Sequence, residues 1–83
     1  MSRYDYEGVP FRARDADGQE YVLTPLYRLK ATAAGWEKDR APEYCVGLRT
    51  EIWQWVTREG AGRYRITDTD PPTVLTSDDP EAV

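Results

Sequence analysis

The stretch Thr24-Pro25-Leu26-Tyr27-Arg28-Leu29-Lys30-Ala31-Thr32-Ala33-Ala34-Gly35 decides the fold class, because it carries the signals that begin and end a helix. Thr24 can cap the first free amides, Pro25 suits the first helical position, where no donor is needed, and Gly35 suits the residue that terminates a helix. The alternative is that the preceding strand continues through Pro25, which would confine that strand to a sheet edge. We favour the helix, which at this length has to pack on a sheet to persist.

Residues 11–23, immediately before this helix, alternate in a way that predicts a β-hairpin. The apolar Phe11 and Ala13 fall on one face of the first strand, and arginines fall on the other. Residues 15–18, with the sequence Asp-Ala-Asp-Gly, are types that tolerate the left-handed backbone of a tight turn. The chain therefore begins with two antiparallel strands.

Residues 50–67 predict a second hairpin, although two patterns compete in its first half. A helix there would begin at Thr50, whereas the many β-branched and aromatic residues of 50–58 favour a strand. Residues 59–62 form a short glycine-rich turn, and residues 63–67 then alternate cleanly as the second strand. We favour the hairpin.

The remaining segments lack regular patterning. Residues 35–42 are polar and predict a connecting loop, with Trp36 folded back on the core. Residues 68–83, rich in Pro and Asp, predict one short edge strand at 73–76 within a flexible acidic tail. The expected architecture is therefore α+β: a small antiparallel sheet in ββαββ order with one short helix on one face. Residues 1–67 form its single domain.

The composition limits the chemistry that the chain can carry out. Its 83 residues include no histidine and a single cysteine, Cys45. A histidine-based triad, an intrachain disulfide and a CxxC zinc or redox pair are therefore excluded, and Cys45 is interpreted as a small buried apolar residue. We expect no enzymatic activity, no cofactor and no metal site.

Charge and hydropathy predict a soluble cytoplasmic protein. No apolar run is long enough for a signal peptide or a membrane span, so no membrane contact is expected. The net charge is −4, from 11 basic and 15 acidic residues. Five of the acids and none of the bases lie in residues 68–83, so the body of the chain is close to neutral.

A surplus of aromatic and arginine side chains points to a binding surface. Arginine outnumbers lysine nine to two, and a small sheet covered by one helix cannot easily bury both of its faces. The alternative is that the termini and the Trp36 loop cover the second face. Trp, Tyr and Arg dominate the energetics of protein interfaces. The predicted partner-contacting residues are the apolar Trp53, Trp55 and Tyr64, with the charged Arg12, Arg14, Arg63 and Arg65.

We therefore expect a small non-catalytic protein-binding module that acts as an accessory regulator or inhibitor, of the sort that phages and mobile elements often encode. One alternative is a module for single-stranded nucleic acid, although such modules normally carry a basic excess. Another is an acidic mimic of DNA that inhibits a nucleic-acid-handling enzyme through the tail. A homodimer that buries the surplus apolar area between two copies is the remaining hypothesis.

Overall fold

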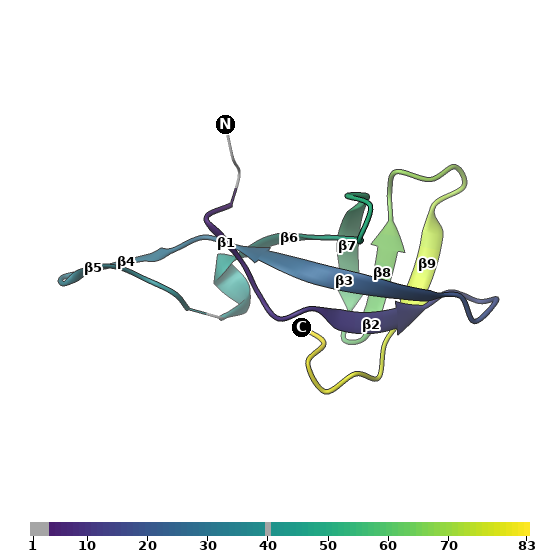
Figure 1. Cartoon of the computed structure of the whole chain (residues 1–83), viewed down its shortest axis with the longest axis horizontal. Coiled ribbons are helices and arrows are strands. Elements are labelled where there is room, and N and C mark those ends of the chain that lie inside the picture. Colours follow the sequence, from purple (N-terminus) through teal and green to yellow (C-terminus); the bar gives the residue numbers. More distant parts are fainter. Residues whose placement is uncertain (1–3, 40) are drawn as a thin grey trace.

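The computed structural model describes residues 4–39 and 41–83, whose regular secondary structure is almost entirely β (Figure 1). No α-helix occurs in this part of the chain, so the predicted α+β class, with its ββαββ order and one covering helix, is wrong. In chain order the elements are β1 (Tyr6–Glu7), β2 (Phe11–Arg14), β3 (Glu20–Tyr27), β4 (Lys30–Thr32), β5 (Gly35–Glu37), the 3-10 helix η1 (Pro42–Tyr44), β6 (Cys45–Arg49), β7 (Trp55–Gly60), β8 (Arg63–Ile66) and β9 (Thr73–Thr76).

Six of the strands close into an antiparallel barrel. The strands β2, β3, β6, β7, β8 and β9 each pair with the next in this series, and β9 returns to β2 through the pair Arg14 and Thr76. The long β3 makes this closure possible, because its first half pairs with β2 and its second half with β6. The short β1 continues the line of β2 along β3. Closure leaves few open strand edges in the barrel.

Pro25 explains why the helix prediction failed. The strand β3 runs straight through Pro25, which pairs with Leu48 of β6, while the Pro25 carbonyl accepts a hydrogen bond from the Gly8 amide at 2.8 Å. In an antiparallel sheet, the N–H and C=O groups of one residue point toward the same neighbouring strand. The missing donor of Pro25 therefore faces the break between β1 and β2, and the β3–β6 ladder loses no hydrogen bond. The continued strand was the correct alternative, but it is not a sheet edge.

Both predicted hairpins are confirmed. The strands β2 and β3 pair around a turn in which Gly18 has a φ of 83° and the Asp15 carboxylate accepts the backbone amides of Asp17 and Gln19. The strands β7 and β8 pair around a turn that contains Gly62. Residues 51–54, in contrast, form the turn between β6 and β7 rather than the first half of a strand.

Side chains that point into the barrel form its core. The outward and inward positions alternate along β2 and β8, as the hairpin pattern predicts. Phe11 and Tyr64 anchor the interior, with ring centroids 5.3 Å apart. The buried core cluster consists of Phe11, Ala13, Leu23, Leu48, Val56, Tyr64, Ile66 and Leu75.

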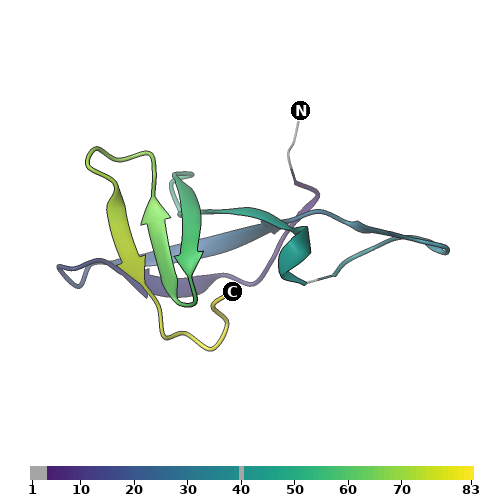
Figure 2. The ribbon, with the colours of Figure 1, turned by 180° about the vertical axis from the view of Figure 1, so that it is seen from behind.

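The segment expected to be a connecting loop belongs to a projecting arm. The strands β4 and β5 pair only with each other, and together they extend away from the barrel (Figures 1 and 2). The Tyr6 hydroxyl donates to the Asp39 carbonyl at 2.8 Å and anchors the base of the arm. Trp36 is 71% exposed on the arm, so it does not fold back on the core.

The C-terminal segment is docked on the barrel rather than flexible. Residues 73–76 form β9, which lies between β8 and β2. Beyond it, the Asp79 carboxylate accepts the Arg12 amide at 3.0 Å, and the Tyr64 hydroxyl donates to the Val83 backbone oxygen at 2.6 Å. Ala82 packs against the core cluster. The expectation of a flexible acidic tail is therefore corrected, because side-chain and backbone hydrogen bonds hold this segment in place.

Candidate functional site

The turn between β6 and β7 presents the most unusual local geometry of the described chain. Thr50 is almost fully buried and organises the turn: its amide donates to the Gln54 carbonyl at 3.0 Å, and its hydroxyl oxygen accepts the Gln54 amide at 3.0 Å. Within this turn Trp53 has a φ of 60°, a backbone conformation that bulky residues rarely adopt. The turn thus holds a tryptophan in a conformation that would suit glycine, and such strain is concentrated at functional positions.

Trp53 contacts a cation and a second aromatic ring. The Arg49 guanidinium carbon lies 4.4 Å from the Trp53 ring centroid, within the range of a cation–π interaction. The Tyr4 ring lies 6.1 Å from Trp53, tilted by 33°. Arg49 is itself fixed by Glu7, whose carboxylate accepts from the Arg49 Nε at 2.6 Å. Residues from the N-terminal segment and from β6 therefore position the indole.

Trp55 extends the same surface onto the outer face of the barrel. Its ring packs over Gly47, where an added Cβ would lie 3.8 Å from the Trp55 ring. The two tryptophan rings meet edge to face, with centroids 6.3 Å apart and an interplanar angle of 78°. Trp53 remains 48% exposed and Trp55 43% exposed, with Ile52 beside them at 76%. We call Tyr4, Arg49, Ile52, Trp53 and Trp55 the aromatic surface.

One acidic side chain is held at the edge of the aromatic surface, and two more acids lie close to it in the chain. The Asp68 carboxylate accepts the Trp55 amide at 2.7 Å, which places the loop between β8 and β9 beside the tryptophans. Figure 1 shows this loop and the β6–β7 turn on the same side of the barrel. Glu51 lies in the turn itself and Asp70 in the adjoining loop, both exposed. No described Lys or Arg forms an ion pair with Glu51, Asp68 or Asp70, whereas Arg49 is neutralised by Glu7.

Of the predicted partner-contacting residues, the structure brings Trp53 and Trp55 together and buries Tyr64. Tyr64 has none of its surface exposed and belongs to the core cluster. Burial raises the pKa of the Tyr64 phenol above its usual range, although the Arg58 guanidinium opposes the shift. Tyr64 is therefore a core residue whose hydroxyl binds the Val83 backbone oxygen, and it is not exposed for contact with a partner.

Three of the four predicted arginines lie away from the tryptophans, and the fourth, Arg65, is opposite Thr57 of β7 and Val74 of β9, between the two sets. Arg14 of β2 and Arg63 of β8 are both opposite Thr76 of β9, so they share the outer side of these three strands. Two carboxylates, those of Glu20 and Glu59, offset half of the charge of the four arginines. Arg12 and Arg14 lie 3.6 and 3.9 Å from the Glu20 carboxylate. Arg65 forms an ion pair with Glu59 that directs it along the strand away from Trp55. The predicted mixed surface is therefore two separate surfaces.

Sequence reasoning missed three members of the aromatic surface, Tyr4, Arg49 and Ile52. Tyr4 reaches Trp53 only because β1 pairs with β3 and β3 pairs with β6, and no local pattern carries that information. The sequence did not point to Arg49, because residues 51–54 were predicted to be part of a strand. In a strand, Arg49 and Trp53 would be too far apart to stack. A turn signal at Thr50, whose side chain caps Gln54, could have placed them together.

Comparisons with known proteins assign no family. No family model matches the chain, and no curated protein or solved structure matches it significantly. The function therefore has to be argued from the surfaces themselves. No helix among the described residues is long and apolar enough to cross a membrane.

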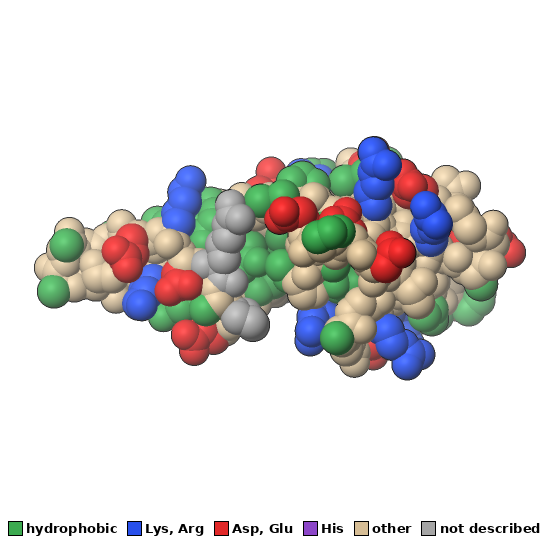
Figure 3. Space-filling model, turned by 90° about the horizontal axis from the view of Figure 1, so that it is seen from below, with side chains coloured by type: hydrophobic (Ala, Val, Ile, Leu, Met, Phe, Trp, Pro, Cys, Tyr) green, Lys and Arg blue, Asp and Glu red, His purple; other side chains and the backbone are tan. Residues whose placement is uncertain are grey.

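A groove lies where β6 separates from β7. The two strands are in register only at Leu48 with Val56 and at Arg49 with Trp55, and they diverge beyond these pairs. The resulting groove has a volume of about 530 Å3, and Figure 3 shows hydrophobic side chains gathered between the arm and the barrel. Cys45 lines the groove as a half-buried free thiol. Of the lining residues only Arg58 is charged, so the groove offers apolar contact and no acid–base pair.

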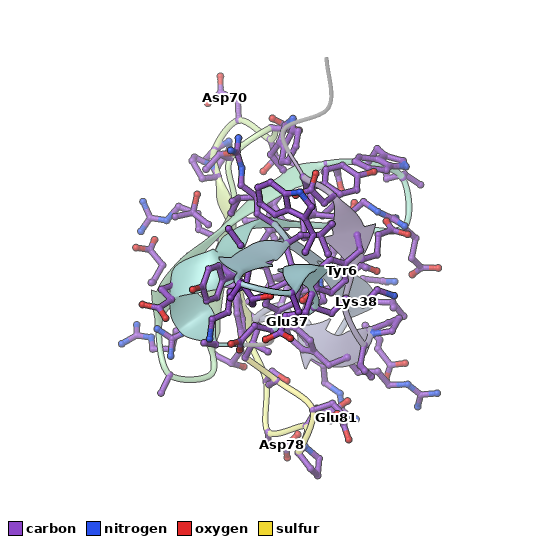
Figure 4. The ribbon with its side chains drawn as sticks, turned by 90° about the vertical axis from the view of Figure 1, so that its left-hand side faces the viewer. Tyr6, Glu37, Lys38, Asp70, Asp78 and Glu81 are labelled. Atoms are coloured by element: carbon purple, nitrogen blue, oxygen red, sulfur yellow. The ribbon has the colours of Figure 1, made fainter. Side chains whose placement is uncertain are left out.

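The acids of the C-terminal segment do not form one surface. Figure 4 shows Asp70 at the opposite end of the molecule from Asp78 and Glu81. Asp68 is bound to the Trp55 amide and Asp79 to the Arg12 amide, at the two ends of the barrel. Within residues 4–39 and 41–83, no three His, Cys, Asp or Glu side chains are grouped so as to hold a metal ion.

Proposed function

We propose that this protein is a non-catalytic protein-binding module and that the aromatic surface is its docking site. The observation that carries the proposal is the pair Trp53 and Trp55, held about half exposed by a turn in which Trp53 adopts a φ of 60°. A glycine in this turn would adopt the positive φ without strain. Tryptophan at this position is strained, and the strain is explained if the exposed indole is needed for docking. A module that binds without chemistry would suit the role of an accessory regulator or inhibitor.

The composition of the aromatic surface supports a protein partner. Tryptophan, tyrosine and arginine are the residues most enriched among interface hot spots, and a rigid ring loses little conformational entropy when it is covered. Trp53 is immobilised in advance by Arg49 and Tyr4. A preorganised aromatic surface of this kind reduces the entropic cost of binding.

The charges disfavour nucleic acid as the partner. Single strands need cations beside the stacking rings, but the only described arginine at the rings, Arg49, is ion-paired with Glu7. Glu51, Asp68 and Asp70 would repel a phosphate backbone. The predicted arginines on β2 and β8 have no ring pair like that of Trp53 and Trp55 among the described residues, and Glu20 and Glu59 compensate two of their four charges. The acids of the C-terminal segment also lie on opposite sides of the molecule (Figure 4). They therefore do not form the continuous row of charges that a mimic of DNA would need.

The proposal is tested by capture with matched tryptophan variants. Wild-type protein, the double variant Trp53→Ala with Trp55→Ala, and Trp36→Ala are immobilised and exposed to a lysate of the cells that produce the protein. Trp36 is the control, because it is an exposed tryptophan on the arm. We expect a partner whose capture falls at least about tenfold with the double variant and not with Trp36→Ala. Equal capture by all three proteins would reject the docking site.

Light scattering and an oligonucleotide titration cover the other hypotheses. A wild-type dimer that dissociates in the double variant would show that the aromatic surface joins two copies of this chain. Quenching of tryptophan emission by oligo-dT, abolished at high salt, would show nucleic-acid binding. Either result would overturn the proposal of a heterologous protein partner.

A further inference from the structure

We infer that the partner segment that docks on the aromatic surface is basic, and that it places a lysine or arginine side chain against the exposed parts of Trp53 and Trp55. This inference rests on the proposed function and specifies the chemistry of the partner. It is carried by the aromatic surface together with the exposed acids Glu51, Asp68 and Asp70, for which the described residues supply no basic partner.

The surface already binds one cation of its own. The Arg49 guanidinium lies 4.4 Å from the centroid of the Trp53 ring. The electron-rich faces of indole rings attract cations, and tryptophan does so more strongly than tyrosine or phenylalanine. Arg49 and Tyr4 occupy only part of the indole surface, since Trp53 is 48% exposed and Trp55 43% exposed. The exposed parts of the two rings are open to a second cation from a partner.

The charge around the rings selects the same kind of ligand. Glu7 is paired with Arg49 at 2.6 Å, but no described basic side chain pairs with Glu51, Asp68 or Asp70. Asp68 is held next to Trp55 by the backbone amide that it accepts, so its charge is fixed at the edge of the surface. An acidic partner would meet three carboxylates that no described basic side chain pairs, whereas a basic partner would be attracted and oriented by them.

The arrangement also argues against a purely apolar partner. Val46, Val74 and Ile52 are exposed on different parts of the molecule, and only Ile52 adjoins the tryptophans in the chain. An apolar segment would cover the rings but would also have to desolvate the neighbouring carboxylates without pairing them. A lysine or arginine satisfies both requirements, because its aliphatic stem packs on a ring while its charged end reaches a carboxylate.

The inference is tested with a displayed library of random peptides. The library is selected on wild-type protein, and each enriched peptide is then assayed on the double variant Trp53→Ala with Trp55→Ala and on Trp36→Ala. Among the peptides that lose binding only on the double variant, we expect lysine and arginine to be enriched at least about twofold over the starting library and aspartate and glutamate to be depleted.

The outcomes separate the inference from the proposed function. Peptides that depend on the two tryptophans but show no basic enrichment would overturn the inference and leave the docking site standing. A selection that yields no tryptophan-dependent peptide would count against both. Enrichment of basic peptides that bind the double variant equally well would reject the inference, because the attraction would then come from charge elsewhere.

Charge-neutralising variants give a second measurement on a synthetic peptide from the selection. Glu51→Gln and Asp70→Asn should each weaken its binding about twofold to threefold at low salt, and the difference should disappear at high salt. Asp78→Asn is the matched control, because it removes an exposed carboxylate at the opposite end of the molecule (Figure 4). Equal effects of Asp70→Asn and Asp78→Asn would show that only the net charge matters, and would overturn the inference.

Discussion

The Arg49 guanidinium stacks on the ring of Trp53 at 4.4 Å while its Nε donates to the Glu7 carboxylate at 2.6 Å. These two contacts connect β6, the β6–β7 turn and β1. Arg49 is thus the residue through which the N-terminal strand fixes the position of the exposed indole.

Removal of the Arg49 charge should destabilise the barrel measurably. Arg49→Gln loses the cation–π contact and the charged hydrogen bond, so we expect a loss of about 1–2 kcal/mol in the free energy of unfolding. Arg14→Gln is the control: its partner Glu20 is 3.9 Å away and both side chains are largely exposed, so its loss should stay within about 0.5 kcal/mol. Urea unfolding followed by circular dichroism measures both values. Equal losses would contradict a special role for Arg49.

The strain at Trp53 predicts that its removal costs little stability. Trp53→Gly loses the stacking on Arg49 but relieves a left-handed backbone that costs a non-glycine residue about 1 kcal/mol or more. We therefore expect a free energy of unfolding within about 1 kcal/mol of wild type. Trp55→Gly should cost about 2 kcal/mol or more, because it loses ring packing over Gly47 and places glycine in a strand. A larger loss for Trp53→Gly than for Trp55→Gly would show that the indole is structural rather than displayed.

The features that could be predicted from the sequence are those encoded by neighbouring residues. The hairpins around Gly18 and Gly62 follow from alternation and from glycines in left-handed turns. The stretch that decides the fold was misinterpreted because both of its helix signals have another use. Pro25 faces the break between β1 and β2, and Gly35 lies in the hairpin of the arm. Neither use is visible before the strands are assembled.

The same limit applies to the candidate site. Trp53 and Trp55 were identified by residue type, and their exposure follows from a barrel whose interior is already filled by residues such as Phe11 and Tyr64. The contact between Tyr4 and Trp53 depends on chain closure over nearly fifty positions, which no local pattern encodes. Residue type therefore singled out the two exposed tryptophans of the candidate site, but only tertiary structure supplied the contacts that position them.

The hydrogen bonds to Asp79 predict that the contact between its carboxylate and the Arg12 amide is lost at acid pH. The backbone amides of Arg12 and Glu81 donate to the Asp79 carboxylate and lower its pKa below the ordinary value of 3.8. Because the folded-state pKa is lowered, this contribution to stability is present above the unfolded-state pKa and is lost as the pH falls through the folded value. NMR titration of the Arg12 amide should therefore show a midpoint below 3.8, and Asp79→Asn should abolish that transition. A midpoint at or above the ordinary value would contradict the docked carboxylate.

Alanine substitutions at Gly62 and Gly18 test whether the backbone of the C-terminal segment packs against the β7–β8 turn. Both have a positive φ, 69° and 83°, so alanine at either position pays about 1 kcal/mol of backbone strain. At Gly18 an added Cβ meets nothing within 4 Å, whereas at Gly62 it would lie 2.6 Å from the Ser77 carbonyl oxygen. The contact at Gly62 is with backbone, and the Ser77 amide donates to the Gly62 carbonyl at 2.8 Å, so neither backbone segment can shift without losing that hydrogen bond.

We therefore expect Gly62→Ala to cost at least about 1 kcal/mol more than Gly18→Ala in the free energy of unfolding, and to increase proteolysis after residue 77. Equal losses for the two variants would show that Ser77 is not held against the β7–β8 turn.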